Sequence, residues 1–591
     1  MSPLETVHIL SSGQFPNSTV PPRVSMSQAA KEALSRSDTS LPRGAACLPC
    51  RKRKMRCDGG RPVCAQCVSR NQSEDCEYAT PQGATRTQLL EENIHILEAR
   101  IQELENPDSP SSSVKLHEPH VLPVNVGPLA QSSHVNERST TEGQTTLSAD
   151  EIYLLTDTFS LHASRLGFFM NVPRFISRVR SPQREPGQSA LHDVLVSVSC
   201  LWGCRLSDGA AMQERQDQLL GLVLEQVASS LSIINSGPLS HDFISFIQAE
   251  VLLANYFFTN DRLLEGRYHS SAAVSLTLSL QLNLQKSIRI QDAGLSEPSA
   301  TLLSGLPSPD DLIQIGERVN AFWTVHSLYK AWAAVLDLPS TVWAGEGPPG
   351  TQVEIPWPLS MDACEKGQIS ISDLDTRCTI MSFLRSGETT PVIELPPLAL
   401  HSRASLLYTH AAWVSNKFTE DMPAADRTAC QEQLHVLHTA VNQFLEEIVA
   451  LEPIRPIRFL LTTSILTRGA LIRLHAKSLK TETRSLETSI SAANGILNIL
   501  QQVNTMEFKY VDPITAVVLS CVGQVYVDEI VRCKLEYERA ERSRSGRQLA
   551  YVSSLQSSAQ QLLICMTDFG RICPLMASRA KQFRTAFATV Q

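Results

Sequence analysis

Residues 46–78 read ACLPCRKRKMRCDGGRPVCAQCVSRNQSEDCEY and hold six of the fifteen cysteines of the chain. These six follow the spacing C-x2-C-x6-C-x6-C-x2-C-x8-C and are Cys47, Cys50, Cys57, Cys64, Cys67 and Cys76. Thiolate sulfur is a strong, soft ligand for zinc, and each C-x2-C pair can hold one ion. The stretch therefore predicts a small domain folded around metal bound by cysteine.

The number of sulfurs limits how two ions could be bound. Six thiolates cannot supply four separate sulfurs to each of two tetrahedral ions, so two cysteines must bridge. The simplest symmetric solution shares Cys47 and Cys64, the first cysteine of each C-x2-C pair. One ion would then also contact Cys50 and Cys57, and the other would also contact Cys67 and Cys76. Both sites would be closed to water, which indicates two structural rather than catalytic zinc ions per chain.

Two other uses of these cysteines compete with that prediction. They could form three disulfides, as in a small secreted domain, or hold a single zinc ion with spare thiols. The first basic residue is Arg23 and no apolar run follows the start, so a secretory signal is not indicated. The nine remaining cysteines are scattered singly through residues 200–573 and read as ordinary buried thiols.

A run of cations lies between the second and third cysteines: Arg51, Lys52, Arg53, Lys54 and Arg56. Residues 43–78 contain eight Lys/Arg and four Asp/Glu, whereas the whole chain has a net charge of −8. Such a local basic patch beside a metal cage suits the phosphate backbone of double-stranded DNA. A solvated face or a nuclear import signal is the alternative interpretation of the same run.

The segment from Ala46 to Cys64 resembles the fungal zinc binuclear cluster family of transcription factors. The basic run, the Asp58 after the third cysteine and Pro62, two residues before the fourth, all match the family pattern. The resemblance implies the two-zinc arrangement with two shared cysteines, a short helix over Leu48–Arg56 whose C-terminal end enters the major groove, and recognition of CGG-type triplets. It also implies a nuclear regulator of RNA polymerase II transcription.

That resemblance assigns roles to the cations. Lys54 is the first candidate for base contact, with Arg53 beside it, because both can donate to guanine O6 and N7. Arg51, Lys52 and Arg56 are assigned to phosphates, which position a protein without reading sequence.

A heptad pattern follows a linker at 81–86 and covers residues 87–106. Apolar residues fill the a and d positions, chiefly Leu90, Ile94, Leu97, Ile101 and Leu104. Isoleucine at a with leucine at d favours a parallel two-stranded coiled coil, so we expect a homodimer. A single amphipathic helix packed on the large domain is the alternative.

The remaining chain divides by composition. Residues 1–42 and 107–146 are rich in serine and proline and lack periodicity, which predicts disorder. Residues 147–591 contain long segments with apolar residues three and four apart, which predicts helices over Phe243–Phe258, Ala272–Leu284, Leu466–Leu479, Ala492–Val503 and Ile514–Val531. No run approaches 18 consecutive apolar residues, so we expect no membrane span.

Part of this helical region resembles the fungal-specific regulatory (middle homology) region. The similarity rests on Leu166–Phe175, Ala249–Tyr256, Gly266–His269 and Glu317–Val325. It implies an all-helical regulatory domain over 147–591, with a coregulator or small-molecule effector as a partner. An unrelated helical domain is the alternative.

These observations predict a mainly α protein: an N-terminal zinc cluster at 43–80, a short coiled coil, and a large helical domain joined by disordered linkers. We expect a DNA-binding transcription factor and not an enzyme, because 147–591 show no nucleophile elbow, P-loop or H-E-x-x-H motif. A zinc–thiolate module that senses metal or redox state, or recruits protein, without reading DNA is the competing hypothesis of another class.

Overall fold

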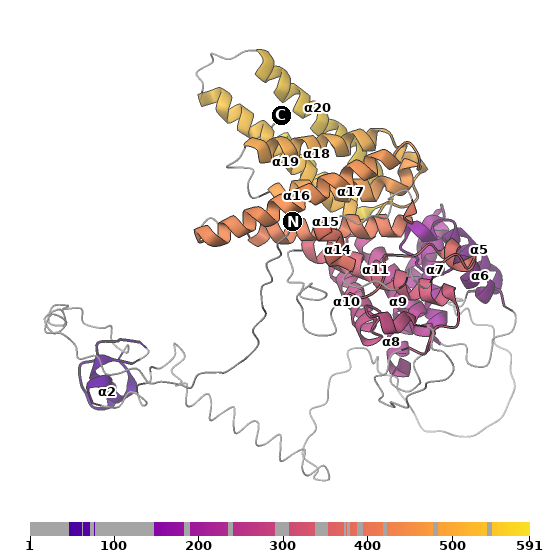
Figure 1. Cartoon of the computed structure of the whole chain (residues 1–591), viewed down its shortest axis with the longest axis horizontal. Helices are drawn as coiled ribbons and strands as arrows, with labels where there is room; N and C mark the ends of the chain where they lie inside the picture. Colours follow the sequence, from indigo (N-terminus) through magenta and orange to yellow (C-terminus); the bar gives the residue numbers. More distant parts are fainter. Residues whose placement is uncertain are drawn as a thin grey trace, which may run out of the picture. The chain divides into compact units, whose positions relative to one another are not determined.

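The computed structural model describes residues 46–61, 63–70, 76, 78, 147–181, 190–234, 240–289, 306–336, 353–370, 374, 379–386, 394–417, 422–476, 483–539 and 546–590. The chain divides into two compact units, residues 1–137 and 138–591. Helices account for all of the regular secondary structure in the described residues (Figure 1). The prediction of a mainly α protein with an N-terminal cysteine cluster is therefore confirmed.

The first unit contains two five-residue helices, α2 (Leu48–Lys52) and α3 (Ala65–Ser69). Five of its cysteines are buried and replace the apolar core that so short a segment could not otherwise form. The expected coiled coil at 87–106, including all of its heptad positions, lies outside the described residues, as do 1–42 and 107–146.

The second unit is helical over its described length. Its α-helices of eight residues or more are α5 (Ala149–Ser160), α6 (Val172–Val179), α7 (Ala190–Leu206), α8 (Ala210–Ile234), α9 (Asp242–Thr259), α10 (Leu263–Ser279), α11 (Leu312–Val335), α14 (Thr379–Ser386), α15 (Pro397–Lys417), α16 (Ala424–Leu451), α17 (Ile457–His475), α18 (Thr483–Gln501), α19 (Ile514–Arg539), α20 (Gly546–Phe569) and α21 (Pro574–Ala588). Shorter elements are η2 (Ala163–Arg165), η3 (Gln285–Ile288), α12 (Met361–Glu365) and η5 (Thr505–Glu507).

Helix starts follow local capping signals. Ser148 and Glu151 form a capping box at the start of α5, and Asn171 caps α6 just before a proline in its first turn. Asp311 caps α11 by accepting a hydrogen bond from the Gln314 N–H. The predicted helix over Ala272–Leu284 was wrong at its end: α10 stops at Ser279, and Gln281 has a φ of 56°, which breaks the helix.

Helix α9 is the central helix of the N-terminal half of this unit, since its side chains are buried on every face. Two of its polar residues hold the segment before α6. Gln248 accepts from the Phe169 N–H at 2.7 Å and donates to the Gly167 oxygen, while Asn255 donates to the Leu166 oxygen at 3.0 Å. A buried polar group needs such partners, so these side chains fix the path of the chain there.

Two buried charges in α11 also hold irregular segments in place. Glu317 accepts from the Asn171 N–H at 3.0 Å and lies 2.7 Å from Nε2 of His241. Arg318 donates to the carbonyl oxygens of Ser287 and Pro307, both at 2.7 Å. These contacts give the Glu-Arg pair a structural role.

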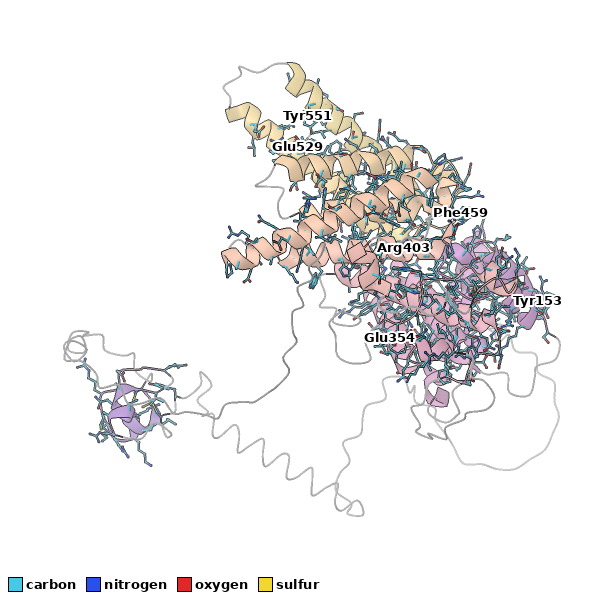
Figure 2. The ribbon with its side chains drawn as sticks, in the orientation of Figure 1. Tyr153, Glu354, Arg403, Phe459, Glu529 and Tyr551 are labelled. Carbon is cyan, nitrogen blue, oxygen red and sulfur yellow. The ribbon has the colours of Figure 1, made fainter. Side chains whose placement is uncertain are left out.

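Helix α15 joins this half to the C-terminal half, which is built from α16 to α21, because it packs against α11 as well as against α16 and α17 (Figure 1). The guanidinium of Arg403 in α15, a residue labelled in Figure 2, lies over the rings of Trp357 and Phe383 at 5.0 and 5.2 Å. In the part of the chain described here, Ile514–Glu536 is the single segment long and apolar enough to cross a membrane, with a mean hydropathy of 1.6. Because 67% of that segment is buried inside the unit, it also meets the description of a core helix.

Candidate metal centre and nucleic-acid interface

The six cysteines of the first unit converge on one centre. Cys47, Cys50, Cys57, Cys64 and Cys67 are at most 8% exposed, and Cys76 is half-buried. Cys50 lies in α2 and Cys67 in α3, while Cys47 and Cys64 are the residues that precede these helices. Each C-x2-C pair is thus formed by an N-cap residue and a residue of the first turn, and the two helices bring the pairs together.

The sulfurs form two groups of four, each with all of its ligand atoms within 4.8 Å of one another. The first group is Cys47, Cys50, Cys57 and Cys64, and the second is Cys47, Cys64, Cys67 and Cys76. The cysteine spacing predicts the same two groups. Cys47 and Cys64 are common to both groups, and their Sγ atoms are 3.6 Å apart.

The spacing between sulfurs fits tetrahedral zinc. Zinc–sulfur bonds of about 2.3 Å place two ligands of one tetrahedron about 3.8 Å apart. The measured Sγ–Sγ distances are 3.7 Å for Cys50 to Cys64, 3.7 Å for Cys47 to Cys67 and 3.8 Å for Cys57 to Cys47. The donor set therefore suits two zinc ions, each surrounded by four sulfurs.

The thiols of the cage have shifted pKa values. Burial raises the pKa of Cys50 and of Cys67 to about 12 and raises that of Cys47 further. For Cys64, burial acts in the same direction, but the Cys67 N–H and the neighbouring thiols lower its pKa to about 6. Without metal, Cys47, Cys50 and Cys67 would stay protonated near neutral pH whereas Cys64 would be largely ionised, and a bound dication favours the thiolate form of all four.

Helix α2 is shorter than predicted, because it ends at Lys52 and not at Arg56. The Met55 N–H donates to the Cys50 oxygen at 2.9 Å and the Lys54 N–H donates to the Arg51 oxygen at 3.2 Å. These two bonds form a Schellman motif, in which the residue after the C-cap adopts a left-handed conformation. Lys54 occupies that position with a φ of 54°, where glycine is usual.

The five predicted cations all have exposed side chains, although they lie between two buried metal ligands. Arg51 and Lys52 belong to the last turn of α2, Arg53 is its C-cap, and Lys54 and Arg56 follow the left-handed turn. The early end of the helix therefore divides the basic run in two and gives its second half a new direction. Positive side chains near a helix C-terminus also complement the helix dipole.

Three further residues support the site, and neither the cysteine spacing nor the basic run predicts a structural role for them. Asp58 accepts from the Ala65 N–H at 3.0 Å and so caps α3. The Tyr78 hydroxyl donates to the Gly60 oxygen at 2.9 Å and lies 3.8 Å from Cys57 Sγ. The Arg61 guanidinium lies over the Tyr78 ring at 5.1 Å. An aromatic residue two positions after the last ligand was the available signal for Tyr78.

Comparison with known proteins agrees with this geometry. Residues 45–85 match the family described as the Fungal Zn(2)-Cys(6) binuclear cluster domain. The chain is 26% identical over 307 residues to the notoamide biosynthesis cluster transcriptional coactivator notQ' of Aspergillus versicolor, covering 50% of this chain and 53% of the relative. It is 40% identical over 63 residues to transcription factor FBD3 of Gibberella moniliformis, covering 11% of this chain and 8% of the relative. The chain thus spans about half of the first relative and a small part of the second.

Proposed function

We propose that this chain, whose residues 45–85 are a fungal Zn(2)-Cys(6) binuclear cluster domain, is a transcription regulator that reads CGG-type half-sites in the DNA major groove. The observation that carries the proposal is the pairing of a closed sulfur cage with a row of exposed cations on one short helix and its turn. Zinc-dependent DNA binding follows from the domain. The CGG preference, the dimer, action on RNA polymerase II and nuclear location are the finer parts of the proposal.

We assign the two zinc ions to the two groups of four cysteines, with Cys47 and Cys64 shared. Bound zinc would supply a structural cross-link and no catalytic step, since four sulfurs leave no coordination position for water. The sulfurs of Cys64 and Cys76 also receive support from the backbone, because the Cys64 N–H donates to Cys76 Sγ at 3.3 Å and the Cys67 N–H donates to Cys64 Sγ at 3.4 Å. Such bonds stabilise the thiolate form that metal binding needs.

The roles of the cations follow from where the turn places them. Lys54 and Arg53 lie at the C-terminal end of α2, the part of the helix that would reach deepest into the groove, and we assign them to guanine O6 and N7. Arg51, Lys52 and Arg56 are assigned to phosphates, where each would strengthen binding on any sequence and increase its salt dependence.

For the remaining segments we propose the organisation inferred from the printed sequence. Residues 87–106 would pair two chains, so that two clusters contact two half-sites, and 147–591 would form the regulatory domain. The helical fold of the second unit supports that assignment. The names of the two relatives support a role in transcription and no enzymatic activity.

Selection of bound duplexes from a random pool with the zinc-loaded full-length chain tests the proposal. We expect enrichment of sequences that contain CGG triplets, and loss of enrichment after treatment with a chelator. A selected pool without a common triplet would contradict sequence-specific reading. Retention of every duplex with equal affinity would do the same, since basic proteins bind DNA non-specifically.

The dimer is tested separately. Ile94→Asp combined with Leu97→Asp places two charges in the proposed seam and should convert a two-half-site footprint into a single one. Gln88→Asp combined with Gln102→Asp adds the same charge at b positions of the two flanking heptads and should leave the footprint unchanged. If both double variants behave alike, the coiled coil is not the dimer contact.

A further inference from the structure

A cavity of about 240 Å³ lies inside the helical unit, far along the chain from the metal centre. Its walls come from η2, α9, α11, α15, α17 and the segment 508–514, so residues as distant as Ser164 and Ile514 share it. Nothing in the zinc cluster function uses this space. Its volume is below the roughly 300–1,000 Å³ of pockets that hold drug-sized ligands, which indicates a smaller occupant.

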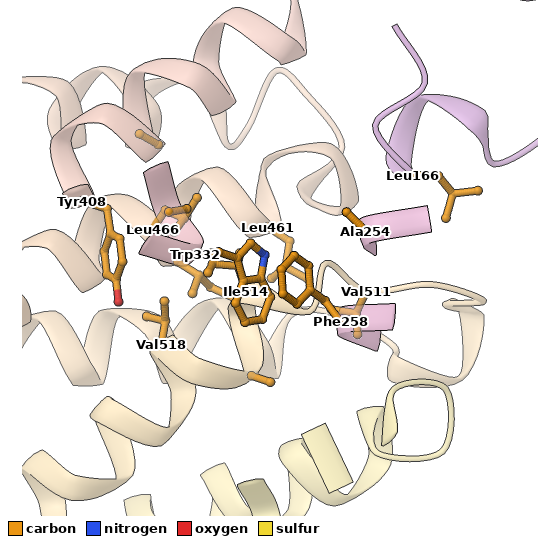
Figure 3. Close-up of a cluster of buried hydrophobic side chains, with 14 of the residues drawn as sticks. Leu166, Ala254, Phe258, Trp332, Tyr408, Leu461, Leu466, Val511, Ile514 and Val518 are labelled. Atoms are coloured by element: carbon orange, nitrogen blue, oxygen red, sulfur yellow. The ribbon is translucent and has the colours of Figure 1, made fainter. Parts of the chain in front are cut away.

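One side of the cavity is apolar and aromatic. Trp332, Leu461, Leu466 and Ile514 line it and belong to the buried cluster shown in Figure 3. Phe508 and Tyr510 add two further rings that are 8% and 4% exposed. The Phe258 ring stacks on the Trp332 ring with the centroids 3.7 Å apart, so the wall is rigidly supported from behind. Such a surface suits a flat hydrophobic body.

Two arginines lie on the same cavity, Arg165 at the end of η2 and Arg458 in the first turn of α17. Among the described residues, neither guanidinium pairs with a carboxylate. The side chain of Arg165 is half-buried and that of Arg458 is exposed, as is the neighbouring Phe459, which Figure 2 labels. Burial together with the charge of Arg458 lowers the pKa of Arg165, as expected of two like charges held close without an anion.

A polar group on the cavity wall also lacks a partner. Thr324 is 7% exposed, lines the cavity, and its Oγ1 makes no hydrogen bond within the described part of the chain. A buried hydroxyl without a partner is unfavourable by about 1–3 kcal/mol, so native proteins rarely leave one. It marks a place where a bound molecule or water would supply the missing partner.

One acidic residue, Asp512, also lines the cavity, and its negative charge would repel an anionic ligand that came close to it. Its Oδ1 accepts from the Ile514 N–H at 3.0 Å, which directs it toward the first turn of α19. Burial raises the pKa of Asp512, whereas His401, which lines the same cavity, lowers it. The two arginines outnumber this one acid, so they set the charge preference of the cavity.

From these contacts we propose that the cavity binds a small aromatic carboxylate, with the carboxylate between Arg165 and Arg458 and the ring against Trp332, Phe508 and Tyr510. Guanidinium groups recognise carboxylates through paired charged hydrogen bonds. This site deepens the proposed regulatory role of 147–591, and its ligand binding is measured without DNA. If the protein fails to read CGG triplets, the proposal for the cavity still stands. If the cavity binds no ligand, the proposal for DNA recognition still stands.

Calorimetric titration of the full-length chain with benzoate tests the proposal, with benzamide as the neutral analogue and inorganic phosphate as the anion without a ring. We expect saturable benzoate binding, and much weaker binding of the other two. Arg165→Gln and Arg458→Gln should each weaken benzoate binding by about tenfold or more, because each removes a charged hydrogen bond. Both variants change side chains outside the buried core, so they should keep the wild-type circular dichroism spectrum.

Arg571→Gln is the matched control, since Arg571 is exposed in the turn before α21 and does not line the cavity. It should bind benzoate as the wild type does. Four results would overturn the proposal: no saturable binding of benzoate, equal binding of benzamide, equal binding of phosphate, or unchanged affinity in both cavity variants.

Discussion

The Met55 N–H donates to the Cys50 carbonyl oxygen at 2.9 Å and thereby closes α2 before the basic run has ended. This bond forces Lys54, between the two, into the left-handed region at a φ of 54°. A lysine there is strained by roughly 1–2 kcal/mol relative to a right-handed residue. Strain of this kind persists at functional positions, which fits the proposed contact between Lys54 and a base.

The strain at Lys54 predicts a conflict between stability and recognition. Lys54→Gly should raise the free energy of unfolding of the zinc-loaded N-terminal unit by up to about 1 kcal/mol, because relief of strain exceeds the entropy that glycine adds to the unfolded state. The same change should reduce discrimination for a CGG triplet by about 1–3 kcal/mol. Urea unfolding, monitored through the release of zinc, measures the free energy of unfolding. Competition between CGG and scrambled duplexes measures the discrimination.

Lys54→Ala separates the two effects, since alanine keeps the left-handed strain and loses the ammonium group. It should lose discrimination as the glycine variant does, without the gain in stability. Equal weakening on CGG and scrambled duplexes would show that Lys54 contacts phosphate and not a base.

The shared sulfurs predict unequal effects of single cysteine changes on zinc content. Cys47→Ala removes a member of both groups and should abolish binding of both ions, whereas Cys57→Ala removes a member of the first group only and should leave one. Zinc per chain, measured by elemental analysis, distinguishes these results. Cys565→Ala, in α20 of the other unit, should retain two ions. One ion in the wild type would exclude the binuclear site.

The Tyr78 hydroxyl predicts a contribution to the stability of the cage. Tyr78→Phe removes the bond to the Gly60 oxygen but keeps the ring beneath Arg61, so it should destabilise the N-terminal unit by about 1 kcal/mol. Tyr78→Leu removes both contacts and should be less stable again. The rate of zinc loss to a chelator reports the order of the three proteins, and identical rates would mean that the loop is held by the cysteines alone.

Two glycines of the helical unit predict opposite results for the same substitution. A Cβ on Gly203 of α7 would lie 2.8 Å from the Leu155 carbonyl carbon of α5, so Gly203→Ala should destabilise the unit by about 1–3 kcal/mol. Gly221 of α8 is exposed and meets nothing within 4 Å, and Gly221→Ala should stabilise by up to about 1 kcal/mol. Thermal unfolding checks both, and equal shifts would contradict the α5–α7 contact.

Buried histidines predict a loss of stability in acid. Burial lowers the pKa of His192 to about 4, below the usual value near 6.5, so the unfolded state binds more protons between these values. Stability should be full above about pH 6.5 and fall as the pH approaches 4. At pH 5 this one group accounts for on the order of 1–2 kcal/mol. His192→Leu should flatten the profile of urea midpoint against pH, and an unchanged slope would assign the acid sensitivity elsewhere.

The sequence by itself determined the ligand grouping, the position of the basic run and the helical class of the second unit. Cysteine spacing is a local property, and two closed tetrahedra from six sulfurs leave few arrangements. Helical periodicity is local too, which is why Ile514–Val531 was placed within α19. The extension of α2 to Arg56 was wrong because the sequence pattern did not reveal the Schellman turn at Lys54.

Only the tertiary structure decided which distant residues meet. Three features depend on the path of the backbone between distant segments. They are the hydrogen bond from Tyr78 to Gly60, the packing of α5 against Gly203, and the cavity that Arg165 and Arg458 share. Periodicity states which face of a helix is apolar but not which helix will cover it. The sequence therefore determined the metal chemistry of this protein, whereas the folded chain alone placed two cations, an unpartnered hydroxyl and an aromatic wall around one space.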